Sequence, residues 1–210
     1  MKVIESADLV KTTLFQGLRG EIVSRVLMQV TRLNKCNKIY AKIYQDRTGT
    51  SFIEAFLEQA GIQYSFNPLD LERIPKTGPF ILIANHPFGG LDALILLKEI
   101  SRVRPDFRFM ANMYLQKIDA IEDLFLPSGA RDEHFDAYSG ISSIKAAKTH
   151  LRDGKPLGLF PAGEVSSIKI GKNQLADNQW QYGILKLIKA AGVPVVPVFF
   201  KGNNSLISSF

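Results

Sequence analysis

The amino-acid sequence predicts an α/β fold, in which helices flank a mixed sheet and an amphipathic helical segment comes first. After Pro75, short apolar segments alternate with helical patterns, and glycine or proline separates most of them. This alternation is typical of α/β folds, whose ligand loops follow the carboxyl ends of strands. The 210 residues are 46% apolar and 22% charged, which is sufficient for a packed core.

After the N-terminal amphipathic segment, the patterns predict four strands and four helices. The strands are expected at Phe80–Ala84, Phe107–Met110, Leu157–Phe160 and Val195–Phe200. The helices are expected at Thr50–Gln59, Leu91–Glu99, Ile141–Arg152 and Trp180–Ala190. Gly61, Gly154 and Gly192 stand where three of these helices should end.

The N-terminal part of the chain is basic and amphipathic. From Leu14 to Val30 apolar residues recur at helical spacing, and residues 1–50 hold nine basic and four acidic side chains, or +5 of the net charge of +6. Such a helix suits an anionic membrane surface, although packing on the protein's own core is an equally good interpretation. Its aromatic residues do not interleave with basic ones, so we do not expect a nucleic-acid partner.

Two domains are expected. Residues 1–73 are predicted to form a helical membrane-associating segment, and residues 74–210 an α/β domain. The last ten residues contain neither a closing helix nor a polar tail, which predicts that this domain is truncated at its C-terminus. Without a spanning apolar run or a signal peptide, the chain is predicted to be a peripheral protein on the cytoplasmic face of the inner membrane. Cys36, His134 and His150 match no metal-ligand spacing, and the two histidines are expected on exposed polar segments, so no metal is expected.

A histidine and an aspartate flank a glycine-bearing loop after the first predicted strand. The loop reads Asn85-His86-Pro87-Phe88-Gly89-Gly90-Leu91-Asp92. From the start of the next helix, Asp92 is able to accept a hydrogen bond from the imidazole of His86, fixing its tautomer and stabilising the imidazolium. The alternative is that Asp92 caps the helix and His86 is an ordinary core residue.

Two other segments lie near predicted strands. They are Phe160-Pro161-Ala162-Gly163-Glu164-Val165-Ser166-Ser167 and Val193-Pro194-Val195-Val196-Pro197-Val198. With the histidine loop they resemble the three conserved blocks of the glycerolipid acyltransferase superfamily, which includes the bacterial 1-acylglycerol-3-phosphate acyltransferases. The resemblance covers residues 74–204, and it is the combination of the blocks that makes it specific.

Three departures from the superfamily pattern point to one of its branches. Five residues rather than four separate His86 from Asp92. Ala162 replaces the glutamate of the Phe-Pro-Glu-Gly block, with Glu164 two places later, and Val165 stands at the position of its arginine. These departures look like the bacterial hemolysin-type proteins that O-acylate lyso-ornithine or lyso-glycine lipids.

The resemblance implies an O-acyltransferase that needs no cofactor. Its partners would be membrane lipids and an acyl thioester of acyl carrier protein or coenzyme A, with His86 as general base and Asp92 as its orienting residue. Backbone N–H groups near Gly89–Gly90 or Gly163 are the expected oxyanion donors. The predicted substrate-binding residues are Asn85, Phe88, Gly89, Gly90, Arg131, Phe160, Pro161, Gly163, Glu164 and Ser166. For Ser166, a capping role is equally possible.

The acceptor and the reaction class leave alternatives open. A valine side chain offers a phosphate no hydrogen-bond donor, so Val165 favours an acceptor with an amino-acid head group. Arg131 is suited to bind a carboxylate, and the alternative is that it belongs to a solvated charge cluster. A lysophospholipid acyltransferase making phosphatidic acid is the rival within the enzyme class, with Lys169 and Lys172 for phosphate. The rival from another class is a non-catalytic lipid-binding or hemolysin-like membrane protein. A serine hydrolase is disfavoured because the sequence has no Gly-x-Ser-x-Gly motif.

Overall fold

The computed structural model describes residues 38–39, 41–43, 46–110, 118–126, 141–169 and 174–202. The chain divides into two compact units, Met1–Tyr64 together with Asn204–Phe210, and Ser65–Asn203. The amphipathic helix predicted from Leu14 to Val30 lies outside the described residues. The predicted boundary between residues 73 and 74 and the membrane role of residues 1–73 stay predictions.

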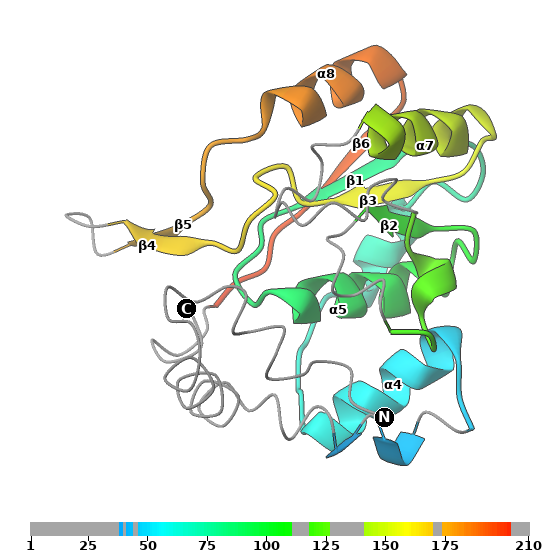
Figure 1. The fold of residues 1–210 in the computed structure, drawn as a ribbon, viewed down its shortest axis with the longest axis vertical. Coiled ribbons are helices and arrows are strands. Elements are labelled where there is room, and N and C mark those ends of the chain that lie inside the picture. Colours follow the sequence, from blue (N-terminus) through cyan, green and yellow to red (C-terminus); the bar gives the residue numbers. More distant parts are fainter. Residues whose placement is uncertain are drawn as a thin grey trace, which may run out of the picture. The chain divides into compact units, whose positions relative to one another are not determined.

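The second unit is built on a parallel sheet with the strand order β2-β3-β1-β6 (Figure 1). Its strands are β1 (Ile81–Ala84), β2 (Arg108–Met110), β3 (Leu157–Leu159) and β6 (Val195–Val198). Ile81 of β1 lies opposite Leu157 on one side and Val195 on the other. Since these strands run parallel, their carboxyl ends meet at one edge of the sheet.

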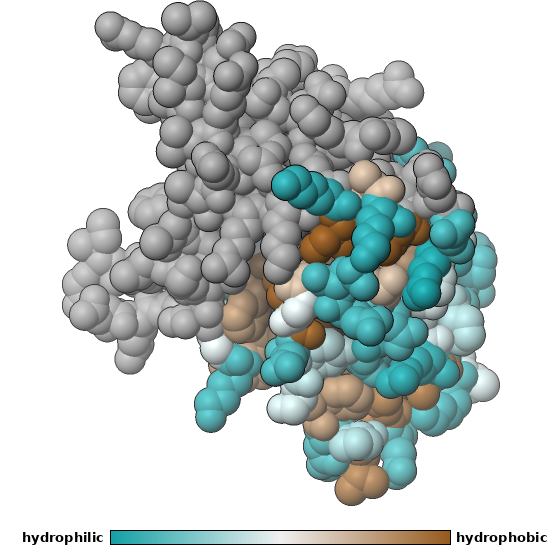
Figure 2. All heavy atoms as spheres, turned by 90° about the horizontal axis from the view of Figure 1, so that it is seen from below, coloured by the Kyte–Doolittle hydropathy of each residue, from teal (hydrophilic) through white to brown (hydrophobic). Residues whose placement is uncertain are grey.

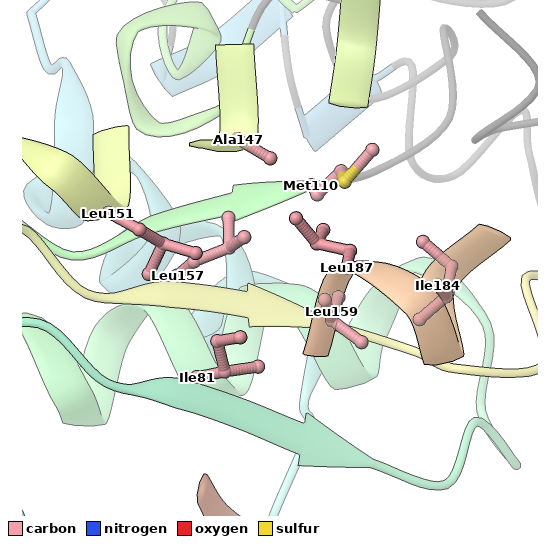
Figure 3. Close-up of a cluster of buried hydrophobic side chains, with 8 residues drawn as sticks. All are labelled: Ile81, Met110, Ala147, Leu151, Leu157, Leu159, Ile184 and Leu187. Atoms are coloured by element: carbon pink, nitrogen blue, oxygen red, sulfur yellow. The ribbon is translucent and has the colours of Figure 1, made fainter. Parts of the chain in front are cut away.

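Helices cover both faces of this sheet. Helix α5 (Gly90–Ser101) lies on one face, and α7 (Ile141–Arg152) and α8 (Tyr182–Ala191) lie on the other (Figure 1). Apolar side chains fill the space under α7 and α8, as Figure 3 shows. This buried cluster consists of Ile81, Met110, Ala147, Leu151, Leu157, Leu159, Ile184 and Leu187. It fixes the strands whose ends carry the predicted chemistry.

Aromatic rings pack beside the middle residue of β3. A side chain at Gly158 would come within 2.4 Å of the Phe109 ring and 2.5 Å of the Phe107 ring, so only glycine fits there. Phe107 stacks on Phe80 at 6.4 Å between ring centroids and meets Phe109 edge-on at 6.2 Å. The rings are fully buried.

A buried arginine ties together three loops that precede strands. The Arg104 guanidinium donates to the carbonyls of Pro75 at 3.1 Å, Gly78 at 2.7 Å and Gly154 at 3.4 Å. It also binds both carboxylate oxygens of Asp106, at 2.9 and 2.8 Å. These loops lie at the amino edge of the sheet, opposite the edge that carries the histidine loop.

The first unit contains α4 (Gly49–Ala60). The helix ends at Gly61, whose φ of 73° is left-handed and whose N–H donates to the Glu58 carbonyl at 3.0 Å. This agrees with the helix predicted at Thr50–Gln59.

The predicted α/β class is confirmed, with differences in detail. Helix α7 has the predicted bounds, whereas α8 begins two residues later than expected because the extended Gln181 donates its N–H to the Pro161 carbonyl at 2.9 Å. The sheet was expected to be mixed, but its described strands are all parallel. Antiparallel pairing occurs in a separate hairpin of β4 (Ser167–Lys169) and β5 (Gln174–Ala176), which the sequence did not predict. Two 3-10 helices, η1 (Pro68–Arg73) and η2 (Glu122–Leu124), were also not predicted.

On the face seen in Figure 2, the described part of the chain is mixed in polarity, with hydrophobic residues interspersed among hydrophilic ones. None of the helices in that part has the length and hydrophobicity needed to span a bilayer.

Candidate active site

Three loops meet beyond the carboxyl edge of the parallel sheet (Figure 1). They follow β1, β3 and β6, and they contain His86, Phe160 and Phe200 respectively. Each loop begins where its strand stops pairing, so its backbone groups need partners other than a ladder.

His86 and Asp92 are in hydrogen-bond contact. The imidazole Nδ1 lies 3.0 Å from Asp92 Oδ2, and the same oxygen accepts the N–H of Phe88 at 2.9 Å. Gly89 makes this possible with φ 66° and ψ −140°, which turn the chain so that α5 begins at Gly90 with Asp92 in its first turn. The contact expected between the two side chains is therefore present.

The environment of the pair fixes its chemistry. The Asp92 side chain is 0% exposed and the His86 side chain 12%. Burial raises the pKa of Asp92, while the hydrogen bonds from His86 and Phe88 act in the opposite direction. Asp92 Oδ1 has no hydrogen-bond partner among the described residues. Because a carboxylate only accepts hydrogen bonds, ionised Asp92 keeps the proton on Nδ1 and leaves the Nε2 lone pair of His86 as a base.

An aromatic stack supports the histidine ring. His86 lies 3.7 Å from the Phe160 ring, centroid to centroid, at an interplanar angle of 17°. Phe160 is buried and packs in turn on Phe109 at 4.8 Å. Phe160 lies against the imidazole and supports the histidine ring, and its predicted contact with substrate stays a prediction.

The main chain of His86 is held on both sides by the base of the hairpin. Its N–H donates to Asp177 Oδ1 at 3.2 Å, and its carbonyl accepts the Ser166 N–H at 2.9 Å. The Ser166 hydroxyl donates to the same Asp177 oxygen. Sequence reasoning missed Asp177, because it lies 91 positions from His86 and only the unpredicted pairing of β4 with β5 brings it there.

The loop after β6 is fastened to the histidine loop. The side chain of Asn85 donates to the Phe200 carbonyl at 2.9 Å and accepts the Phe200 N–H at 2.7 Å. The Phe88 ring packs so closely on Gly202 that a Cβ there would lie 2.8 Å from it. The amide of Asn85, predicted to bind substrate, is thus used to join two loops.

The loop after β3 forms the neighbouring wall. Gly163 has a left-handed φ of 75° and donates to the Phe160 carbonyl at 2.9 Å, closing a turn in which Pro161 is buried. The exposed Glu164 accepts a 2.6 Å hydrogen bond from Asn178. Val165 is 40% exposed, and its Cγ2 would lie 3.7 Å from a Cβ on Gly89. The structure thus brings the valine next to the histidine loop.

Several sequence predictions fall elsewhere. Arg131, His134, Lys172 and Cys36 lie outside the described residues. His150, expected on an exposed segment, is half-buried and donates from Nε2 to the Pro156 carbonyl at 3.0 Å, and burial lowers its pKa. A hollow lined by Lys148, Leu151, Arg152, Ala190, Ala191 and Val193 contains none of the predicted site residues. Within the described ranges, no cluster of His, Cys, Asp and Glu is arranged to bind a metal ion.

Comparison with known proteins found a family model and curated relatives that match this chain. The model of a family described as acyltransferase matches residues 12–209. A lyso-glycine lipid O-acyltransferase of Phocaeicola vulgatus is 23% identical over 171 residues, which cover 80% of this chain and 57% of the relative. A lyso-glycine lipid O-acyltransferase of Bacteroides thetaiotaomicron is 25% identical over 187 residues, which cover 88% of this chain and 65% of the relative. The chain thus spans roughly three-fifths of the length of these curated relatives. Because the family model covers almost all of this chain, the chain belongs to the acyltransferase family.

Proposed function

We propose that this chain carries the active site of a lipid O-acyltransferase. The enzyme transfers a fatty acyl group from acyl carrier protein or coenzyme A to the hydroxyl of a lyso-lipid. The observation that carries the proposal is the His86–Asp92 contact at the carboxyl edge of a parallel sheet, in a chain of the acyltransferase family. The two relatives named lyso-glycine lipid O-acyltransferases support a lipid acceptor.

The chemistry requires a base on the acceptor hydroxyl. His86 Nε2 takes the hydroxyl proton while the oxygen attacks the thioester carbonyl, and Asp92 stabilises the imidazolium that results. The tetrahedral intermediate then breaks its carbon–sulfur bond, and the imidazolium returns the proton to the leaving thiolate. The products are an ester and a free thiol, and the protein needs no covalent intermediate.

The oxyanion of the intermediate needs hydrogen-bond donors. The first N–H groups of a helix have no partner within the helix, and α5 begins at Gly90, directly after the histidine loop. We assign the donors to the backbone around Gly89 and Gly90. A donor in this position commonly contributes about 10²–10³-fold to kcat.

We propose a lyso-aminolipid, a lyso-glycine or lyso-ornithine lipid, as the acceptor. Val165 supports this choice because an exposed isopropyl group beside Gly89 offers a phosphate no donor. The names of the two relatives point in the same direction. Lysophosphatidic acid is the competing acceptor.

The acceptor is tested by an acyl-transfer assay on the complete protein. Lyso-glycine lipid, lyso-ornithine lipid and lysophosphatidic acid are each offered with acyl carrier protein and coenzyme A donors. We expect the highest kcat/KM with an aminolipid, and a shift toward lysophosphatidic acid in Val165→Arg but not in Val165→Leu. A wild-type preference for lysophosphatidic acid would overturn the choice of acceptor and leave the His86 chemistry standing.

We also propose that the protein works as a peripheral protein at a membrane, on the cytoplasmic face of the inner membrane. The excess of basic side chains in residues 1–50 supports this proposal. The exposed aromatic side chains of Trp180 (42%) and Tyr182 (71%) support it as well, and Lys186 Nζ lies 4.4 Å from the Tyr182 ring centroid. Co-sedimentation with vesicles tests the membrane contact. We expect binding to anionic vesicles that weakens with salt, and equal binding to zwitterionic vesicles would contradict an electrostatic contribution.

A further inference from the structure

We propose that Asp177 is the positioning residue of the active site, which holds the main chain of His86 from the base of the β4–β5 hairpin. The inference rests on the proposed function, since it presupposes that His86 is the base. Asp177 is not among the site residues predicted from the sequence.

The contacts form a closed arrangement around one peptide segment. Asp177 Oδ1 accepts the His86 N–H at 3.2 Å and the Ser166 hydroxyl, and the Ser166 N–H returns to the His86 carbonyl at 2.9 Å. The register pairs Ser167 with Ala176. Ser166 and Asp177 therefore flank the base of the hairpin, and both bind the histidine backbone.

The side-chain contacts of His86 orient its ring but do not hold its main chain, and this arrangement does. Asp92 and Phe160 fix the orientation of the ring, but the ring moves with its Cα. His86 follows the last residues of β1, so no strand ladder holds its N–H and carbonyl. A displacement of about 1 Å at a reacting group commonly costs about 10²-fold in rate.

The role depends on an acceptor oxygen rather than on the charge of Asp177. Both donors, a backbone N–H and a hydroxyl, are neutral, so the amide oxygen of asparagine is able to replace the carboxylate while alanine is not. The charge has a separate effect, because the Asp177 carboxylate is one of the groups that raise the pKa of Asp92. Asn and Ala variants therefore separate positioning from electrostatics.

The test compares Asp177→Ala and Asp177→Asn in the complete protein, with Asp153→Ala as the control. Asp153 is an exposed aspartate that directly follows α7 and precedes β3, so it lies toward the amino edge of the sheet, opposite the edge that carries the site loops. We expect kcat to fall about 10–100-fold in Asp177→Ala, with KM for the acceptor within about 3-fold of wild type. Asp177→Asn should recover kcat to within about 3-fold, and the acid limb of its kcat–pH profile should move to lower pH.

A second measurement does not depend on turnover. Hydrogen–deuterium exchange of the peptide that contains His86 should be faster in Asp177→Ala and unchanged in Asp153→Ala and Asp177→Asn. In addition, Ser166→Ala combined with Asp177→Ala should lower kcat no further than Asp177→Ala alone, because the Ser166 hydroxyl binds Asp177 and alanine retains the main-chain N–H that Ser166 donates to the His86 carbonyl.

The outcomes are distinct. Wild-type kcat and wild-type exchange in Asp177→Ala would overturn the inference, and an effect confined to KM would assign Asp177 to acceptor binding instead. If the wild-type protein transfers no acyl group to any acceptor, the proposed function fails, and exchange at His86 still decides whether Asp177 holds the loop.

Discussion

At the scale of single residues, Asp92 combines two opposed properties. It is fully buried, one of its oxygens has no partner among the described residues, and burial raises its pKa. It also accepts hydrogen bonds from His86 and Phe88, which favour the ionised form. A buried carboxylate costs folding free energy. In the proposed mechanism the same carboxylate orients the imidazole of His86 and stabilises its charged form.

The first prediction concerns Asp92→Asn. We expect kcat to fall about 10²–10⁴-fold, since an amide neither stabilises the imidazolium nor enforces the same tautomer. The variant should be at least as stable as wild type at neutral pH. Because the folded pKa of Asp92 is raised, the cost of its charge is present above that pKa and is relieved as pH falls through it.

Thermal unfolding of wild type and Asp92→Asn between pH 5 and 8 checks the sign of this effect. The difference in free energy of unfolding should be largest at the alkaline end and shrink toward the acid end. A variant that is less stable than wild type at pH 8 would show that the carboxylate stabilises the fold. Full activity in this variant would remove Asp92 from the mechanism.

At the scale of elements, the turn from β1 into α5 determines the geometry of the site. Gly89 combines φ 66° with ψ −140°, a conformation that side chains disfavour, while Gly90 is an exposed helical residue with negative φ. A Cβ on Gly89 would meet nothing closer than Val165 at 3.7 Å. The demand for glycine at position 89 is therefore conformational rather than steric.

The second prediction follows from this pair of glycines. Gly89→Ala should destabilise the protein by about 1–3 kcal/mol and lower kcat, because relief of the strain displaces Asp92 from His86. Gly90→Ala, the matched control, should change stability by less than about 1 kcal/mol. Chemical unfolding and acyl-transfer rates measure both, and equal effects in the two variants would contradict the explanation.

The predictability of each element depends on whether its signal is local. The bounds of α7 were predictable because its apolar residues recur at helical spacing and Gly154 follows its end. The His86–Asp92 contact was predictable because both residues belong to the same short loop, Asn85–Asp92. The hairpin strands have three residues each, too few for a period, so the β4–β5 pairing and Asp177 were not predictable. The role of Phe160 beneath the imidazole depends on how β1 and β3 pair, which spacing alone does not reveal.

At the scale of the whole molecule, the two edges of the sheet have separate tasks. The carboxyl edge carries His86 and its supports, while Arg104 joins Pro75, Gly78 and Gly154 at the amino edge. The hydrogen bonds from Arg104 lower the pKa of Asp106. Asp106 thus stabilises the fold above its usual pKa, and this contribution is lost as pH falls through the lowered value.

The third prediction is that Arg104→Ala lowers stability without altering the chemistry of the site. Three carbonyls lose a donor, and we expect a loss of about 3 kcal/mol in the free energy of unfolding. The difference between wild type and variant should narrow below about pH 4, where Asp106 is protonated. The control Arg73→Ala removes an exposed ion pair and should change stability by less than about 1 kcal/mol. A specific loss of kcat in folded Arg104→Ala would contradict the separation of the two edges.

His86 is the proposed base of the acyl transfer. The most direct measurement is the rate of transfer to a lyso-aminolipid by the complete protein, comparing wild type, His86→Ala and His150→Gln, each also tested for binding to lipid vesicles. We predict that His86→Ala loses about 10²–10⁴-fold in kcat while vesicle binding is retained, and that His150→Gln stays close to wild type. Equal rates for wild type and His86→Ala would contradict the account, and vesicle binding without transfer by wild type would favour a non-catalytic lipid-binding protein.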